Sequence, residues 1–125
     1  MISPIATDQA PPPAGTYSQG IEATGRMVFL SGQTPRLPDG TRLGDVPFKE
    51  QAIQALRNLE AVAAAAGLSL ATHGAKVTVY LKNLDDRVEF DAVYAEFLGD
   101  VPPSRTIVQS NFTMFDIEVD AILVA

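Results

Sequence analysis

The clearest pattern in the chain is a series of apolar residues spaced three and four positions apart, from about Val46 to Ala66. This spacing places apolar side chains on one face of a helix. Asp45 is available as the N-cap, and Gly67 provides a C-terminal stop. We therefore predict a helix whose alanine-rich face packs closely against a flat partner such as a sheet; this face consists of Ala52, Leu56, Leu59, Ala63 and Ala66.

A second helix is predicted from about Asp86 to Leu98. Phe90, Val93, Tyr94 and Phe97 form an apolar stripe at helical spacing. Gly99 is expected to end the helix, and the Pro102-Pro103 pair prevents its continuation.

Four segments have the short apolar runs or the alternation typical of strands. They are Met27–Leu30, Ala75–Leu81, Arg105–Gln109 and Phe115–Val124. The order strand, helix, strand, helix, strand, strand predicts an α+β fold. We expect a two-layer sandwich in which two helices cover one face of a mixed β-sheet.

The second face of such a sheet would have no helix to cover it. Alternation places Tyr80, Ile122 and Val124 on this face, where large apolar side chains are costly to expose to water. We therefore expect another subunit to cover it.

The chain is expected to form one domain over residues 1–125. Its length is within the usual size of a domain, and 46% of its residues are hydrophobic, which is enough for a core. The proline-rich stretch Ala10–Ala14 is interpreted as an extended lead-in. No signal peptide or transmembrane segment is recognisable, so a soluble, cytoplasmic protein is expected.

Composition excludes several classes of site. The chain has no cysteine and only one histidine, His73, which excludes thiolate nucleophiles and multi-histidine metal sites. No phosphate-binding glycine loop occurs, so no nucleotide cofactor is expected. The acidic residues form neither a calcium loop nor a cluster with histidine, so no metal is expected. A net charge of −6 makes nucleic-acid binding an improbable function. His73 is interpreted as an exposed loop residue without a role.

Arg105 is the strongest candidate for a ligand contact. It follows Pro102-Pro103-Ser104 and opens an apolar strand, and its guanidinium can hold a carboxylate by two parallel hydrogen bonds. A surface arginine or one in a structural ion pair would fit the sequence as well.

A candidate base lies among Asp116, Glu118 and Asp120, which alternate along the last strand and are expected on one face. Mutual repulsion could raise the pKa of one carboxyl group, although such alternation also marks a solvated face. Tyr17 and Ser31 carry hydroxyl groups beside glycines, where they could serve a site or simply form turns.

Several motifs in a fixed order resemble the RidA (YjgF) family, also known as endoribonuclease L-PSP. The resemblance covers most of the chain, through Gly15-Thr16-Tyr17-Ser18-Gln19, Ser31-Gly32-Gln33-Thr34-Pro35, the helix Gln51–Gly67, Pro103-Ser104-Arg105-Thr106 and Glu118-Val119-Asp120-Ala121. It implies a chorismate-mutase-like fold and a homotrimer with sites at the subunit interfaces. It also implies cofactor-free hydrolysis of 2-aminoacrylate, 2-iminobutyrate and related 2-imino acids to 2-keto acids and ammonia.

The resemblance also assigns roles to individual residues. Arg105 would bind the substrate carboxylate, and Glu118 would activate water and transfer protons. Tyr17 would help to orient the water. Ser31 and Gly32 would shape the pocket wall, and the backbone of Ile107 would supply polar contacts.

Two departures from the family pattern concern the pocket. Asp91 stands where asparagine is usual, so it adds a negative charge that could repel a carboxylate or face another subunit. The loop around Ser110–Phe115 is shorter than in RidA proper and is expected to alter access. These departures raise the possibility of a different imine or enamine, such as an aminomuconate-like compound.

Two other functions compete with the deaminase. One is an endoribonuclease or translation inhibitor, which the acidic composition opposes. The other is a non-catalytic trimer that binds a small carboxylate through Arg105 or holds a protein partner.

Overall fold

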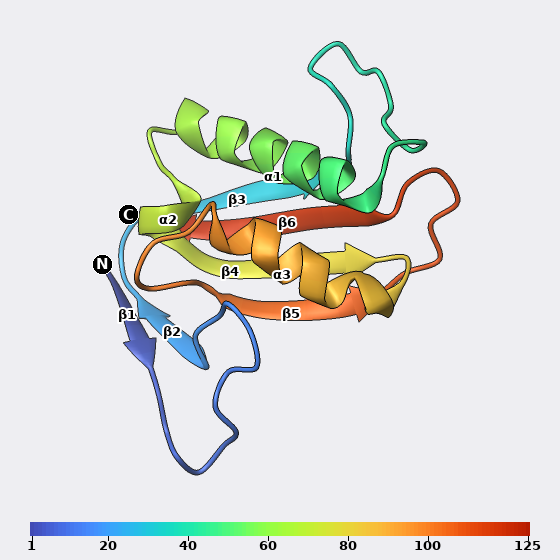
Figure 1. The fold of residues 1–125 in the computed structure, drawn as a ribbon. Helices are drawn as coiled ribbons and strands as arrows, with labels where there is room; N and C mark the ends of the chain where they lie inside the picture. Colours follow the sequence, from blue (N-terminus) through green and yellow to red (C-terminus); the bar gives the residue numbers. More distant parts are fainter.

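The computed structural model describes residues 1–125 and contains one main sheet with helices on one side (Figure 1). The strand order is β3-β6-β4-β5. β4 pairs with β5 in parallel, whereas β6 pairs antiparallel to both β3 and β4, which confirms the predicted mixed sheet. The strands are β3 (Met27–Gln33), β4 (Gly74–Leu81), β5 (Ser104–Gln109) and β6 (Ile117–Val124).

Both long helices lie against the same face of this sheet, which confirms the two-layer α+β architecture. α1 (Phe48–Ala65) packs on β3 and β6, and α3 (Arg87–Ala95) packs beside α1. Leu56 and Leu59 of α1 and Phe90 of α3 are fully buried in one core cluster. No helix has the length and apolar character needed to cross a membrane.

The start of α1 differs from the prediction. Asp45 does not cap the helix; the capping position is taken by Pro47, which makes no side-chain bond. Proline suits this position because its fixed φ fits a helix start, where a backbone N–H is dispensable. The C-terminal end of α1 agrees with the prediction, because Gly67 follows the helix with a φ of +76°, a conformation that favours glycine.

The second helix is shorter than predicted and is preceded by a 3₁₀ turn, η1 (Leu84–Asp86). Asn83 caps this turn by accepting from the Asp85 backbone N–H at 2.9 Å. A further short helix, α2 (Leu70–His73), was not predicted. Ser69 caps it by accepting from the Thr72 backbone N–H at 3.1 Å.

An N-terminal hairpin was also missed. β1 (Ile2–Ile5) and β2 (Gly20–Ala23) form a separate two-stranded antiparallel sheet, visible in blue at the lower left of Figure 1. Strands of four residues are too short to give a clear alternation, and Pro4 weakens the strand pattern of β1 further. The lead-in between them is tied by Gln19, whose side chain bonds to Thr7 and Pro11.

Register separates the two faces of the sheet. Val77 pairs with Arg105 and with Ala121, and this row lies on the helix-covered face with the buried Val77 and Ala121. The neighbouring rows, which include the Tyr80–Glu118 pair, therefore lie on the opposite, uncovered face.

The uncovered face carries large apolar side chains in contact with solvent. Phe29 is 68% exposed, Met27 56% and Val108 43%. Tyr80 and Ile122 are half-buried there, as predicted for side chains that no helix covers, whereas Val124 is buried within the chain.

Candidate functional site

A pocket of about 910 Å³ opens between α3, β5 and the loop that precedes β2. It brings together four of the residues singled out from the sequence, namely Tyr17, Asp91, Arg105 and Ile107. The remaining lining residues come from these three segments and from the turn η1, which supplies Leu84; the others are Ala14, Gly15, Arg87, Val88, Ala92 and Thr106. Candidate ligand-binding groups from distant parts of the chain therefore converge at one place.

Arg105 lies at the base of this pocket with a side chain that is only 6% exposed. Its guanidinium carbon lies 5.1 Å from the ring centre of Tyr17, 5.2 Å from that of Tyr94 and 5.7 Å from that of Phe90. Aromatic rings at such distances attract a cation and restrict its movement. The arginine is thus held in a fixed position, unlike a solvated surface residue.

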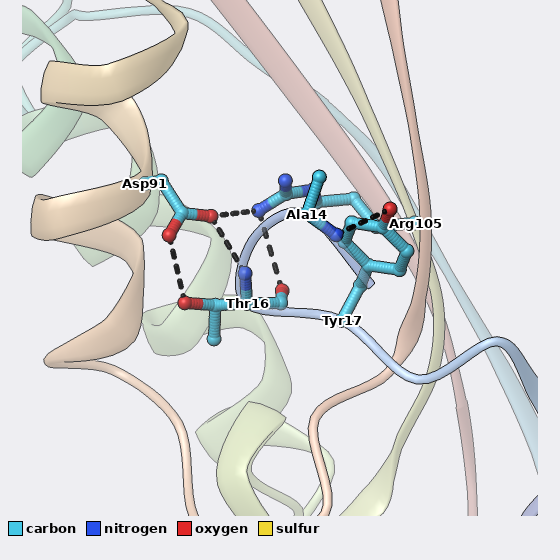
Figure 2. A network of polar contacts seen from close by, with 5 residues as sticks. All are labelled: Ala14, Thr16, Tyr17, Asp91 and Arg105. Carbon is cyan, nitrogen blue, oxygen red and sulfur yellow. Dashed lines mark hydrogen bonds and ion pairs between the residues drawn. The ribbon is translucent and has the colours of Figure 1, made fainter. Parts of the chain in front are cut away.

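Asp91 on α3 compensates this buried charge (Figure 2). Its Oδ1 lies 2.7 Å from Arg105 Nη1 in the only ion pair of the chain. The Thr16 backbone N–H donates to the same oxygen at 2.8 Å, and the Thr16 hydroxyl donates to Oδ2 at 2.9 Å. A single carboxylate therefore joins α3, β5 and the N-terminal loop.

The surroundings determine the ionisation of Asp91 and of Tyr94, which is buried beside Arg105. Burial acts against the charged form of Asp91, but hydrogen bonds from Thr16 and Arg105 and the attraction of Arg105 outweigh it, so the pKa of Asp91 lies below its usual value. Burial raises the pKa of the Tyr94 phenol, which therefore stays neutral and places no negative charge beside Arg105.

Tyr17 is held by its own loop. Its hydroxyl oxygen accepts from the Ala14 backbone N–H at 3.0 Å, which leaves its proton free to donate to a ligand or a water. The loop is fixed to the segment before β5 by Ser18, whose hydroxyl donates to Pro102 O at 2.6 Å and whose N–H donates to Pro103 O at 3.1 Å.

Gly15 provides a first test of this arrangement. A Cβ at this position would lie 2.9 Å from Asp91 Oδ1 and 3.0 Å from Arg105 Nη2, so Gly15→Ala should displace the ion pair. We expect the free energy of unfolding, measured by urea titration, to fall by about 1–3 kcal/mol, which is the cost of leaving a buried hydrogen-bonding group without its partner. Gly20→Ala is the control because its Cβ would meet only Ile5, at an ordinary 3.4 Å. Equal free energies of unfolding for the two variants would contradict the tight packing around the ion pair.

The depressed pKa of Asp91 predicts how the ion pair contributes to stability. A carboxyl group with a lower pKa in the folded state stabilises the fold above its unfolded pKa of about 3.9, and the contribution disappears as pH falls through the folded value. The free energy of unfolding of the native chain should therefore exceed that of Asp91→Asn at pH 7, and the difference should shrink below about pH 4. Urea titrations from pH 7 to pH 2 would measure it. Asp100→Asn, at an exposed carboxylate without an ion pair, should show no such loss, and a difference for Asp91→Asn that persists at pH 2 would refute the assignment.

Glu118, Ser31 and Gly32 form a second group on the uncovered face. Leu30 of β3 pairs with Ala121 of β6, and Gln33 pairs with Val119. β3 therefore advances by three residues where β6 advances by two, which marks a β-bulge at Ser31-Gly32. The Glu118 carboxylate occupies the space that a Cβ of Gly32 would need. The motif Ser31-Gly32 thus makes room for Glu118, and neither residue lines the pocket of Arg105.

A single chain does not bring Arg105 and Glu118 together. They project from opposite faces of the sheet, and β4 lies between their strands. Two strand spacings separate the two backbones by about 10 Å before the side chains diverge further. The pocket within one chain therefore holds the guanidinium of Arg105, which has donors suited to an anion, but no carboxylate other than Asp91.

Other candidates lie elsewhere. Asp116 precedes β6 and accepts from the Gln51 side chain of α1 at 3.1 Å, so the prediction that it shares a face with Glu118 and Asp120 is wrong. The cause is the buried Gln51, which needs partners for its amide. His73 Nδ1 accepts from the Ser69 backbone N–H at 3.1 Å, away from the pocket.

Two further expectations concern the pocket border. Ile107 lines the pocket, and its strand β5 lies at the edge of the sheet. Alternate backbone N–H and C=O groups of an edge strand have no partner in a neighbouring strand. Polar contacts between the backbone and a ligand require such unpaired groups. The loop around Ser110–Phe115 does not border the pocket within one chain. It packs instead against Gly44, whose missing Cβ leaves space for the Met114 carbonyl.

Some residues that line the pocket or hold its ion pair were not identified from the sequence. Thr16 was part of a motif, but nothing in the sequence indicated that its N–H and hydroxyl would bind Asp91. Leu84, Arg87 and Val88 form the outer wall, and their position depends on the unpredicted turn η1. The chain contains no cluster of three or more His, Cys, Asp or Glu side chains suited to a metal ion.

Comparison with known proteins identifies the family. The family described as Endoribonuclease L-PSP matches residues 7–125. The chain belongs to this family. The match confirms the resemblance to RidA, since the RidA of the Antarctic bacterium Psychrobacter has a crystal structure with the same fold, at a TM-score of 0.71 and 35% identity over 98% of this chain and 99% of that one.

Two relatives of this family are informative. A RutC family protein of Pyrococcus horikoshii is 41% identical over 120 residues, which are 94% of each chain. TdcF of Escherichia coli, provisionally named a reactive intermediate deaminase, is 36% identical over 96% of this chain and 95% of its own. The crystal structure of TdcF with bound serine superposes with a TM-score of 0.70 over 98% of each chain. The family thus includes a protein named for reactive intermediate deamination.

Proposed function

We propose that this protein hydrolyses reactive imines and enamines derived from amino acids, such as 2-iminobutyrate and 2-aminoacrylate, to 2-keto acids and ammonia. The observation that carries the proposal is the fixed guanidinium of Arg105 at the base of a half-apolar pocket. A relative of similar length, TdcF, supports it through its name and through its crystal structure with serine, which carries a carboxylate beside an amino group.

Arg105 would anchor the substrate. Its Nη1 is engaged by Asp91 and by Thr16 O, at 2.7 and 3.3 Å, whereas its Nη2 and Nε have no hydrogen-bond acceptor in the chain. These two donors form the edge that can hold two oxygens at once. The apolar side chain of the substrate would then face Leu84, Val88 and Ile107.

Chemistry in this pocket requires addition of water to the imine carbon. Glu118 would take one proton from the water and pass it to the imine nitrogen, which gives a carbinolamine. It would then pass the hydroxyl proton to the same nitrogen, so that the C–N bond breaks and ammonia leaves as the C=O bond forms. Tyr17, whose hydroxyl proton is free, would orient the water. A conjugated imine is already reactive, so orientation and one proton-transfer group are sufficient.

Because Glu118 lies on the opposite face of its own sheet, we propose that it reaches the pocket of a neighbouring copy in a homotrimer. Phe29, Met27 and Val108 support this assembly, since exposed apolar side chains of this size on one sheet face favour burial against another subunit. Ser31 and Gly32, which lie beside Glu118, would enter the same interface as its wall. The cysteine-free chain suits a reducing cytoplasm, where we place this activity.

A coupled assay tests the deaminase. An amino-acid oxidase generates 2-iminobutyrate in place, and loss of the imine is followed with and without the protein. We expect clear acceleration over spontaneous hydrolysis, together with release of ammonia. No acceleration with either 2-iminobutyrate or 2-aminoacrylate would contradict the proposal. Binding of 2-ketobutyrate without any turnover would instead favour a non-catalytic carboxylate-binding trimer.

The family name favours an endoribonuclease as the second candidate. Recognition of RNA relies on Lys and Arg that neutralise phosphates, and the net charge of −6 opposes this. Cleavage of RNA that falls steeply with added salt and is lost with Arg105→Ala would favour the nuclease over the deaminase.

A further inference from the structure

The charge of Arg105 is compensated before any ligand arrives. Both oxygens of Asp91 are occupied, Oδ1 by Arg105 and the Thr16 N–H, and Oδ2 by the Thr16 hydroxyl. Three hydrogen bonds from fixed donors keep this carboxylate in place, and its pKa below the usual range keeps it ionised near pH 7. A carboxylate ligand would therefore meet an ion pair instead of an isolated cation.

The remaining donors of Arg105 do not distinguish an acid from its amide. Nη2 and Nε can donate to the two oxygens of a carboxylate, to the two adjacent carbonyl oxygens of a neutral 2-keto amide, or to the carbonyl oxygen and imine nitrogen of a neutral 2-imino amide. Preference for the anion depends on an uncompensated positive charge, because attraction between opposite charges is the only contribution that the amide lacks. Geometry supplies the anchor, and charge decides which ligand is preferred.

No other lining residue supplies a positive charge near Arg105 that would make the pocket prefer anions. Its other wall residues near Arg105 are apolar or hydroxyl-bearing, as in Ile107, Ala92 and Tyr17. The second cation of the lining, Arg87, lies on an exposed turn of α3 where solvent screens its charge. Asp91 is the only carboxylate that a single chain contributes to the lining, and it pairs directly with Arg105, so it sets the charge at the guanidinium.

We propose that Asp91 is a specificity-determining residue: by compensating Arg105 it makes the pocket accept neutral imines, such as the amides of 2-imino acids, about as well as the acids themselves. The expected effect on turnover of neutral imines rests on the proposed deaminase function. The expected effect on ligand binding rests on the ion pair alone.

Asp91→Asn removes the charge and keeps the shape. The amide oxygen can still accept from the Thr16 N–H and Arg105, and the amide nitrogen can donate to the Thr16 hydroxyl in place of accepting from it. Calorimetry with 2-oxobutanoate and 2-oxobutanamide then gives the ratio of the two affinities for each protein. Glu89→Gln is the matched control, since it removes one negative charge from the same helix outside the pocket.

For the native chain and Glu89→Gln we expect acid and amide affinities within about threefold of each other, as for a weakly charged site. For Asp91→Asn we expect the acid to gain tenfold or more over the amide, as an uncompensated partly buried cation would give. A native chain that prefers the acid by tenfold, an unchanged ratio in Asp91→Asn, or no binding of either ligand would overturn the inference. A shifted ratio in a protein that deaminates no imine would overturn the proposed function alone.

Discussion

Replacing Arg105 with lysine is expected to reduce kcat/KM for 2-iminobutyrate by about 100-fold, even though the positive charge is kept. The reason is geometric, because the lysine ammonium is a point charge and cannot present the two parallel donors of the Nε and Nη2 edge. Loss of a charge-assisted bidentate contact costs about 3 kcal/mol, and each 1.36 kcal/mol corresponds to a tenfold change in rate. The coupled imine assay measures this loss directly.

Two controls isolate the effect of Arg105. Arg57→Lys changes an exposed arginine of α1 and should keep the native rate. The thermal transition of Arg105→Lys should stay close to that of the native chain, because an ammonium can still pair with Asp91. Native turnover by Arg105→Lys would show that the guanidinium does not anchor the substrate.

Glu118→Gln is expected to lower kcat by roughly 100-fold or more, which is the usual contribution of a general acid–base group. Glutamine has the same shape, so it fits the space beside Gly32 and leaves the bulge intact. Binding of 2-ketobutyrate should persist, since the anchor on Arg105 is unchanged. The change should therefore affect kcat more than KM.

The matched control for this variant is Asp120→Asn on the same face of β6. Asp120 accepts from the Tyr80 hydroxyl at 3.2 Å, so it has a structural partner of its own. We expect Asp120→Asn to keep most of the native kcat. An equal loss in both variants would mean that the charge of this face, and not proton transfer by Glu118, supports turnover.

Much of the fold follows from local patterns in the sequence. Helix spacing around Leu56 and alternation around Val79 predicted the layers correctly, because burial on one face enforces both periods. Boundaries were less predictable, as the start of α1 shows: Pro47 competes with Asp45 for the first turn, and the sequence contains both signals. The hairpin of β1 and β2 is too short for its period to be recognised.

The candidate site was predictable only in part. Arg105 and Asp91 could each be singled out, one by its position before an apolar strand and the other by its departure from a family pattern. Their 2.7 Å ion pair could not be foreseen, because it depends on how α3 crosses β5 in three dimensions. The separation of Glu118 from Arg105 follows from strand order, which alternation within single strands does not encode.

The ion pair also suggests why Asp91 can persist beside a group that binds anions. A guanidinium on a side chain that is only 6% exposed is costly to bury without a partner, and asparagine would compensate it only through a dipole. The ion pair with Asp91 would then both stabilise the fold and weaken the preference of the pocket for acids over amides. Asp91→Asn is expected to reverse both together.

The shared site is tested most directly by combining two variants of very low activity in one oligomer. Arg105→Ala and Glu118→Gln chains are mixed in equal amounts, unfolded, refolded together and assayed with 2-iminobutyrate. If each site takes Arg105 from one copy and Glu118 from its neighbour, about one quarter of the sites in random trimers contain both intact residues, and about a quarter of the native activity should return. If the mixture stays as inactive as its two parents, no site is shared between copies and the account is contradicted.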